Sequence, residues 1–193
     1  MKKLSLIFLT IFIFSLSYSK KNVYTSEDYS ELLKTTNNQV IELIKNKNVK
    51  NLSEHIHPKK GVLFSPYSYI PYEGNVILTK KNIARTYDEN EKLTWGVYDG
   101  TGEKIFLTFD EYYDKFIYNA DFINSVPNYD SIMGIGNSIE NTNKYFPNTK
   151  TVEYYVYGTK KYSGMDWKSL RLVYEQYKEK YYLVAIIHNQ WTI

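Results

Sequence analysis

The last 28 residues, 166–193, constrain the fold more than any other part of the chain. They form two apolar runs, rich in β-branched and aromatic residues, joined by the polar residues Lys178, Glu179 and Lys180. This pattern is typical of a long β-hairpin. A hairpin alone is marginally stable in water, so the rest of the chain has to pack against it.

Alternation along the second run predicts which side chains share a face of the hairpin. One face would carry Val184, Ile186, His188 and Gln190, and the other Leu183, Ala185, Ile187, Asn189 and Trp191. Both faces begin with apolar residues and end with polar or aromatic ones. We therefore expect the tip of this strand to reach the rim of a cleft.

Two capping boxes predict where helices begin. Thr25 with Asp28 begins a first helix, whose apolar positions recur at helical spacing to about Lys47. Thr108 with Glu111 begins a later helix that carries its aromatic residues on one face.

Further strands are predicted at residues 61–65 and 151–157. Residues 93–98 and 103–108 flank the sequence DGTG at 99–102, which predicts a second hairpin. Helices followed by mostly sequential strands predict an α+β fold. We expect a single domain, with N-terminal helices packed on a curved, mostly antiparallel sheet that ends in the long C-terminal β-hairpin.

Residues 124–150 show neither helical nor strand periodicity. They contain two prolines, two glycines and six asparagines. A connection of this length within a compact domain indicates a functional flap, an insertion or an unrecognised element.

The N-terminus predicts a signal peptide over residues 1–19, followed by one domain over 20–193. Two lysines precede an apolar run over 4–16, and Ser17 and Ser19 are the small residues expected before a cleavage site. The chain has no cysteine, which excludes disulfides and lipid attachment to cysteine. We expect an exported protein, periplasmic or secreted, with no stable membrane insertion after cleavage.

The charge of the chain argues against nucleic acid as a partner. Removing the two lysines of residues 1–19 leaves 22 basic and 21 acidic residues. A nearly neutral protein lacks the positive field that phosphate backbones require.

The predicted ligand-binding residues are Trp95, Arg171, His188, Gln190 and Trp191. All except Trp95 lie in the C-terminal hairpin, where polar and aromatic side chains gather at one end of apolar strands. Arg171 is one of only two arginines, and its planar guanidinium suits a carboxylate. The alternative for Arg171 is an internal salt bridge with an acidic residue, namely Glu153, Glu175 or Asp166.

No metal, cofactor or catalytic residue is predicted. His55, His57 and His188 could together form a three-histidine zinc site only if the first two pointed the same way. At the end of a short helix they would diverge by about 100° per residue. The sequence therefore favours histidines of caps and turns over a metal site.

Four segments resemble an uncharacterised family of bacterial exported proteins and lipoproteins. They are 57–67 (HPKKGVLFSPY), 95–96 with 99–102 (WG and DGTG), 164–167 (GMDW) and 187–193 (IHNQWTI). The resemblance covers most of the mature chain and implies export, but no activity. The chain departs from the lipoprotein members because it has no cysteine to acylate.

The order of elements is also similar to NTF2-like and cystatin-like α+β cones. In those, a long N-terminal helix packs in a curved antiparallel sheet and the last strands line a pocket. Some NTF2-like proteins are enzymes, and many exported ones are binding or accessory domains. A fold does not by itself determine a function.

Three functions are compatible with these observations. The first is a non-enzymatic binding or accessory module of the cell envelope, whose small-molecule, peptide or envelope ligand lies in a cleft beside the hairpin. The second is an envelope hydrolase or lyase with His188 as general base. The third is a structural or assembly protein that docks through residues 124–150. The oligomeric state stays open.

Overall fold

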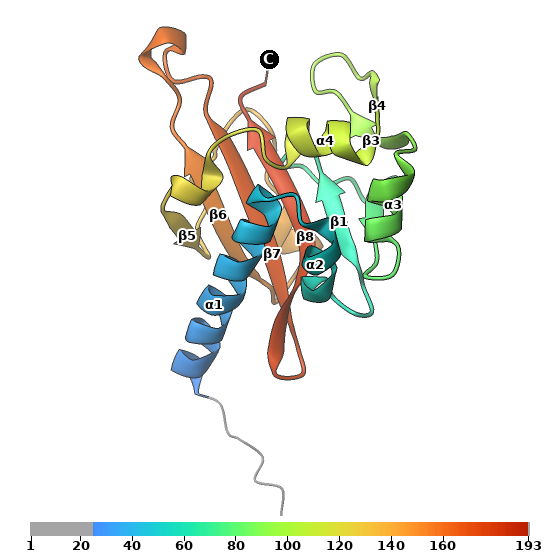
Figure 1. Cartoon of the computed structure of the whole chain (residues 1–193). Coiled ribbons are helices and arrows are strands. Elements are labelled where there is room, and N and C mark those ends of the chain that lie inside the picture. The colour runs from blue at the N-terminus through green and yellow to red at the C-terminus, as the bar shows by residue number, and fades with distance from the viewer. Residues whose placement is uncertain (1–24, 193) are drawn as a thin grey trace, which may run out of the picture.

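The computed structural model describes residues 25–192 and has an α+β architecture. An N-terminal helix packs beside a mixed six-stranded sheet that ends in a long C-terminal hairpin (Figure 1). The predicted signal peptide lies outside the described residues. Within the described chain, none of the helices has the length and apolar character needed to cross a membrane.

The helices and strands predicted from the sequence occur in the predicted order, and a short strand and a short helix lie within residues 124–150, where neither was predicted. The helices are α1 (Ser26–Lys45), α2 (Val49–Leu52), α3 (Ile83–Glu89), α4 (Phe109–Phe116) and α5 (Thr142–Tyr145), with short 3₁₀ turns at Ser53–His55, Phe122–Asn124 and Lys160–Tyr162. The strands are β1 (Val62–Ser65), β2 (Val76–Leu78), β3 (Leu93–Val97), β4 (Lys104–Leu107), β5 (Pro127–Tyr129), β6 (Lys150–Val156), β7 (Lys168–Tyr177) and β8 (Lys180–Gln190).

The C-terminal hairpin occupies the centre of the large sheet. The strand order is β2-β1-β8-β7-β6-β5, and β1 pairs with β8 in parallel, whereas the other neighbours are antiparallel. Strands β3 and β4 form a separate two-stranded sheet, as the DGTG turn predicts. The long hairpin and the second hairpin are thus confirmed.

Both capping boxes are formed. Thr25 Oγ1 accepts a hydrogen bond from the backbone N–H of Asp28, and the Asp28 carboxylate accepts one from the backbone N–H of Thr25. Thr108 and Glu111 make the same reciprocal pair at the start of α4. Each box satisfies N–H groups that a helix start leaves without partners.

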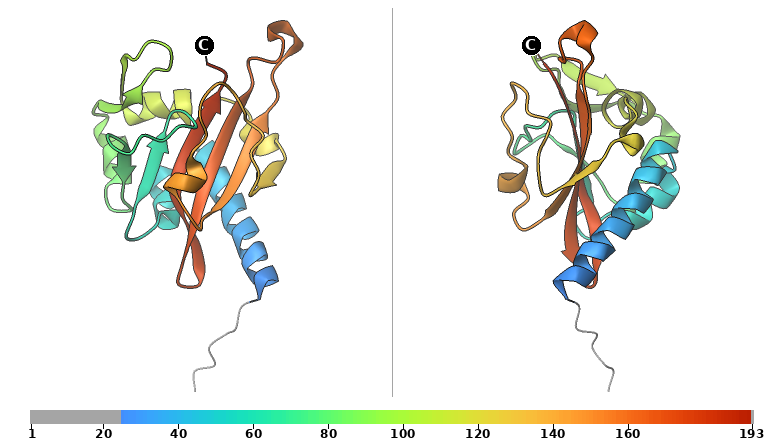
Figure 2. Two further views of the ribbon diagram at one scale, coloured as in Figure 1. Left: turned by 180° about the vertical axis from the view of Figure 1, so that it is seen from behind. Right: turned by 90° about the vertical axis from the view of Figure 1, so that its left-hand side faces the viewer.

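The two faces of the sheet are covered differently. Helices α1 to α4 lie on one face, and the segment that contains α5 crosses the other (Figure 2). The large core lies on the helical face. Its members include Val40, Ile44, Leu52, Phe64, Phe109, Tyr112, Phe116, Leu172, Tyr174 and Ile186. The small core on the second face contains Leu63, Ile70, Val173, Val184, Ala185 and Ile187.

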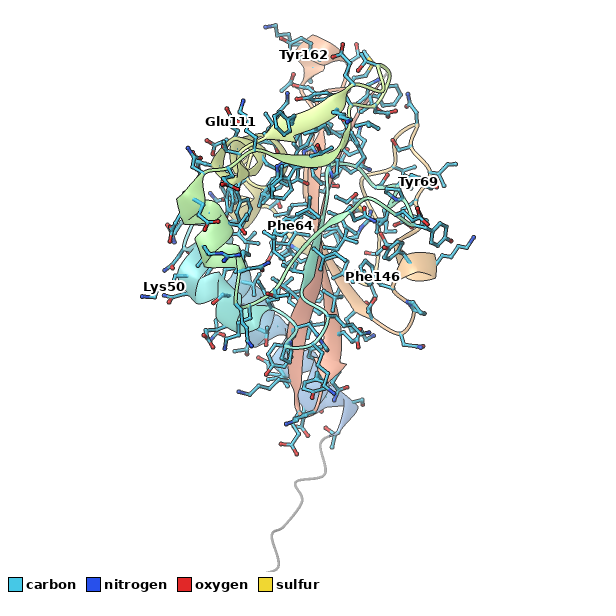
Figure 3. All side chains as sticks on the ribbon, turned by 90° about the vertical axis from the view of Figure 1, so that its right-hand side faces the viewer. Lys50, Phe64, Tyr69, Glu111, Phe146 and Tyr162 are labelled. Atoms are coloured by element: carbon cyan, nitrogen blue, oxygen red, sulfur yellow. The ribbon has the colours of Figure 1, made fainter. Side chains whose placement is uncertain are left out.

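Residues 130–149, which we call the strap, form the cover of the second face. Tyr145 and Phe146 of the strap pack against the small core. In an edge-on view of the sheet, Lys50 and Glu111 lie on the helical side, whereas Tyr69 and Phe146 lie on the strap side (Figure 3). Most of the stretch that lacks sequence periodicity is therefore a structural layer, with β5 leading into it.

A β-bulge changes the predicted faces of β8. Val173 pairs with Ala185 but the next residue, Tyr174, pairs with Leu183, so β8 contains one extra residue, Val184. Leu183 packs in the large core and Val184 in the small one. The prediction of strict alternation is wrong at these two positions, because a bulge lets one strand place an extra residue opposite its partner.

Candidate functional site

The five predicted ligand-binding residues are distributed over both faces of the sheet. Arg171 pairs with Ile187 across the hairpin, whereas His188 pairs with Leu170. Paired residues of antiparallel strands share a face, so Arg171 lies on the strap side and His188 on the helical side. They therefore do not line one pocket together. Trp191, which follows β8, is 40% exposed.

Arg171 is the centre of a buried charge cluster under the strap. Its guanidinium donates to Glu140 at 2.6 Å, to Thr142 at 2.8 Å and to Glu153 at 3.1 Å. Glu153 is fully buried and also accepts from the Ser169 hydroxyl at 3.0 Å. The internal salt bridge with Glu153 is thus present, and a second one joins Arg171 to the strap.

Glu153 and Asn189 hold the strap by its backbone. The backbone N–H groups of Met133 and Gly134 both donate to Glu153 Oε2. Asn189 Nδ2 donates to the carbonyl of Gly134 at 2.9 Å. These bonds satisfy polar groups that would otherwise be costly to bury.

His188 is buried and has a partner for each ring nitrogen. Its Nδ1 lies 3.0 Å from the carbonyl oxygen of Pro66, and its Nε2 lies 3.1 Å from Nδ2 of Asn119. A carbonyl can only accept and an amide NH₂ can only donate, which assigns the proton to Nδ1. Burial lowers the pKa of His188 to about 4.

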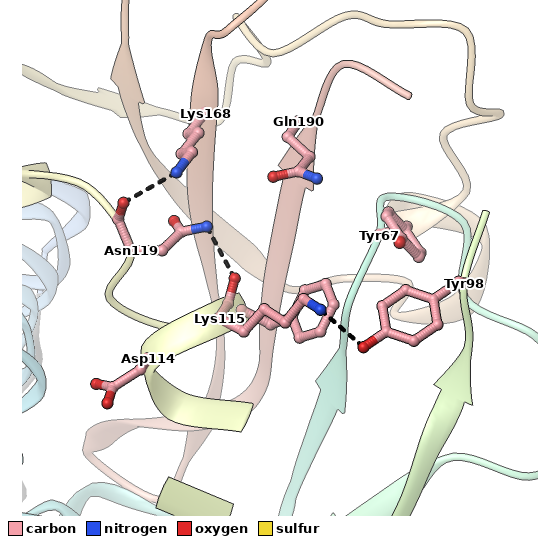
Figure 4. A pocket seen from close by; sticks show the side chains of 8 residues that line it. Tyr67, Tyr98, Asp114, Lys115, Asn119, Lys168 and Gln190 are labelled. Carbon is pink, nitrogen blue, oxygen red and sulfur yellow. Dashed lines mark hydrogen bonds between the residues drawn. The ribbon is translucent and has the colours of Figure 1, made fainter. Parts of the chain in front are cut away.

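A cavity of about 420 Å³, which we call the basic cavity, is lined by Asn119, the partner of His188, but not by His188 itself. Its walls come from the ends of β7, β8 and α4 and from two tyrosines (Figure 4). The lining residues that matter here are Tyr67, Tyr98, Lys115, Asn119, Lys168 and Gln190. Gln190 is thus one predicted residue that faces a cavity.

Hydrogen bonds connect the walls of the basic cavity. Lys115 Nζ donates to the Tyr98 hydroxyl at 2.8 Å, and Lys168 Nζ donates to the carbonyl of Asn119 at 3.1 Å. Asn119 Nδ2 donates to the carbonyl of Lys115 at 2.8 Å (Figure 4). These bonds fix α4 against the end of β7 and against the β3–β4 hairpin.

A second cavity of about 760 Å³, the aromatic cavity, adjoins the first. Tyr67 and Tyr98 line both cavities, so the two meet at this pair. The aromatic cavity lies between the loop after β1, the β3–β4 hairpin and the strap. Burial raises the pKa of Tyr67, so its hydroxyl stays neutral.

Two sets of contacts hold the wall of the aromatic cavity together. Trp95 is buried at its back, where Nε1 donates to the carbonyl of Leu107 at 2.9 Å and the ring stacks on Tyr112 at 4.1 Å. The Asp99 carboxylate accepts from the Thr192 hydroxyl at 2.5 Å and joins the hairpin turn to the end of the chain.

Sequence reasoning missed most of the residues that line the basic cavity. Tyr67 occurs in the segment SPY, which predicts a loop, and Tyr98 occurs in the segment VYDG, at the end of a predicted strand. Asn119 lies three residues beyond the end of α4, where its amide donates to the carbonyl of Lys115. Helical periodicity therefore gave no signal for its position.

The two cavities present hydrogen-bonding groups, charged side chains and aromatic rings. Within residues 25–192, no three His, Asp or Glu side chains are grouped as metal ligands. Comparison of the chain with protein-family models and with curated proteins finds no match. Function therefore has to be argued from geometry.

Proposed function

We propose that the protein is a non-enzymatic binding or accessory module of the cell envelope whose ligand occupies the basic and aromatic cavities. The observation that carries this proposal is the meeting of the two cavities at Tyr67 and Tyr98. Their volumes, about 420 and 760 Å³, suit a small molecule or a short peptide. Gln190 and Trp95 would contribute directly, and His188 would support the wall through Asn119.

The surroundings of His188 support binding over catalysis. A general base needs a free nitrogen within reach of the substrate. Both nitrogens of His188 already face protein groups, and neither partner is a carboxylate or a hydroxyl. A hydrolase that uses His188 would have to break the contact with Asn119 first.

The contacts of the strap support a covering role over a docking role. Its polar groups are directed at Arg171, Glu153 and Asn189 of the sheet. A docking segment would need those groups for its partner. We therefore place the ligand in the cavities rather than on residues 124–150.

The NTF2-like cone is part of the proposal. In such cones the last strands line the pocket, and here the end of β8 reaches the basic cavity. The space between α1 and the sheet is filled by Asn37, which donates to the Tyr154 hydroxyl at 2.6 Å and accepts from the Tyr174 hydroxyl at 3.1 Å. This filling supports a ligand at the end of the sheet and not beneath α1. Export would place the ligand in the periplasm or the medium.

A thermal-shift screen of envelope sugars, peptides and small amphiphiles tests this function, because a ligand that binds only the folded state raises the unfolding temperature. The blocking variant is Thr101→Trp, which projects a large ring from an exposed turn residue of the aromatic cavity. The matched control is Glu103→Trp, an exposed neighbour that lines neither cavity.

We expect compounds that raise the unfolding temperature of the unmodified protein and of Glu103→Trp, but not that of Thr101→Trp. Hits that survive Thr101→Trp unchanged would place binding elsewhere and contradict the proposed site. Tryptophan fluorescence provides a second readout, because Trp95 lies at the back of the aromatic cavity.

A further inference from the structure

Two ammonium groups line the basic cavity without a carboxylate partner. Within the described chain, neither Lys115 nor Lys168 forms an ion pair. The one acidic residue that lines this cavity, Asp114, pairs with Lys47 at 2.6 Å and points away from Gln190 (Figure 4). The cavity therefore has an excess of positive charge.

Both lysines also retain hydrogen-bond donors. An ammonium group has three N–H donors. Lys115 gives one to Tyr98, and Lys168 gives one to the carbonyl of Asn119. These two bonds hold the side chains in place, and the remaining donors can serve a ligand. Bonds from an ammonium to an anion are the stronger kind of hydrogen bond.

Asn119 adds an acceptor to this wall. Its Nδ2 donates to Lys115 and to His188, whereas its Oδ1 is buried and has no partner. A buried acceptor without a donor costs free energy, which a ligand N–H would recover. The wall of the cavity thus combines positive charge with one acceptor that lacks a donor.

The neighbouring cavity has a different character. Tyr67, Tyr69 and Tyr98 line it together with Pro66 and Pro71. Aromatic and proline surfaces favour an apolar or aromatic body. Because Tyr67 and Tyr98 belong to both cavities, one molecule can reach both.

We infer that the ligand is an anionic amphiphile: its anionic group binds at Lys115 and Lys168, and its apolar or aromatic body lies in the aromatic cavity. This inference rests on the proposed function. An N-acyl amino acid, or the last residue of a peptide, carries the required carboxylate, N–H and side chain. A phosphate monoester would satisfy the same two lysines.

The test compares three probes by calorimetric titration of the purified protein: N-acetyl-phenylalanine, its neutral amide, and phenyl phosphate. We expect the acid to bind at least about tenfold more tightly than the amide, the usual effect of one charge-assisted hydrogen bond. Raising the salt from about 0.05 M to about 0.5 M should weaken binding of the acid and leave the amide unchanged. Tighter binding of phenyl phosphate would assign the anion as phosphate and support the inference equally.

The variants are Lys115→Gln and Lys168→Gln, with Lys104→Gln as the control. Lys104 is exposed on β4 and lines neither cavity. We expect each test variant to reduce the preference for the acid to about threefold or less, and the control to keep it. Unfolding curves that match those of the unmodified protein exclude a folding defect.

Two outcomes overturn the inference. The first is equal binding of the acid and the amide, which would overturn the anionic ligand but leave the proposed cleft in place. The second is that none of the three probes binds, although an uncharged compound from the screen does. Failure of every ligand in the screen would instead overturn the proposed function itself.

Discussion

At the scale of single residues, burial holds His188 in its neutral form. Its partners are a backbone carbonyl and an amide, and the only charge that acts on it strongly, that of Lys168, also lowers its pKa. In the unfolded chain the imidazole would titrate near 6.5. Protonation of His188 is therefore easier after unfolding than before it.

This difference predicts a loss of stability in mild acid. The contribution of His188 is fully present above about pH 6.5 and is lost as the pH falls toward about 4, up to about 3 kcal/mol. Urea unfolding between pH 7 and pH 4 measures it. The difference in free energy of unfolding between the unmodified protein and His188→Gln should shrink as the pH falls across this range, because only the unmodified protein loses the contribution of His188. The other histidines titrate in both proteins and cancel from this difference. A difference that does not change with pH would contradict the prediction.

Arg171 and Glu153 illustrate the asymmetry of buried ion pairs. Both side chains are almost completely buried, so each charge depends on the other. Removing one partner leaves a buried charge uncompensated, which typically costs about 3–5 kcal/mol. We expect Arg171→Met to lower the free energy of unfolding by this amount, as measured with urea.

The double variant Arg171→Met/Glu153→Gln is the control for that measurement. Glutamine can still accept from the strap backbone through its amide oxygen but carries no charge. It should therefore be more stable than Arg171→Met alone. A double variant that is less stable than the single one would show that the charge of Glu153 stabilises the fold without Arg171.

The pairing of Arg171 could be predicted in part. Glu153 was among three expected partners, and the structure places it directly opposite Arg171 on the neighbouring strand. Glu140 and Thr142 could not be predicted, because they lie in the strap, which has no periodic pattern. The surroundings of His188 also depend on Asn119 and Pro66, which are far away in the sequence.

At the scale of elements, the strap depends on a close approach to β7. A Cβ at Gly134 would lie 2.6 Å from the Ser169 hydroxyl and 3.0 Å from the Trp167 ring. Gly134 does not have a positive φ, so the constraint on this position is steric.

We expect Gly134→Ala to loosen the strap and to cost about 1–3 kcal/mol, as overpacking usually does. Limited proteolysis should then cut within residues 130–149 faster than in the unmodified protein. Ile135→Ala, at an exposed neighbour, should change stability by no more than about 0.5 kcal/mol. Equal proteolysis of the strap in both variants would refute the proposed close packing.

Elements were predictable where their signals are local. The capping boxes at Thr25 and Thr108 and the DGTG turn act within a few residues, and the structure contains all three. The bulge at Val184 and the parallel pairing of β1 with β8 are set by distant partners. A single sequence contains no comparable signal for such pairings.

At the scale of the whole molecule, the fold separates the buried charge cluster under the strap from the two lysines of the basic cavity. The strap neutralises Arg171 with two carboxylates on one face of the sheet. On the other face, at the end of the hairpin, Lys115 and Lys168 form no ion pair with any of the described residues. The sequence predicted that both faces of the hairpin end in polar or aromatic residues, but not which distant residues meet them on each face.

The signal peptide predicted from the sequence gives the last prediction. Described structure begins at Thr25, whose capping box starts α1. A cut after Ser19 would therefore remove none of the contacts described above. Mass spectrometry of protein recovered outside the cytoplasm should give a chain that starts at Lys20. Ser19→Leu should block processing, because the residue before the cut must be small, whereas Tyr18→Leu should not. A chain that keeps residues 1–19 after export, or that is processed equally in both variants, would contradict the proposed signal peptide.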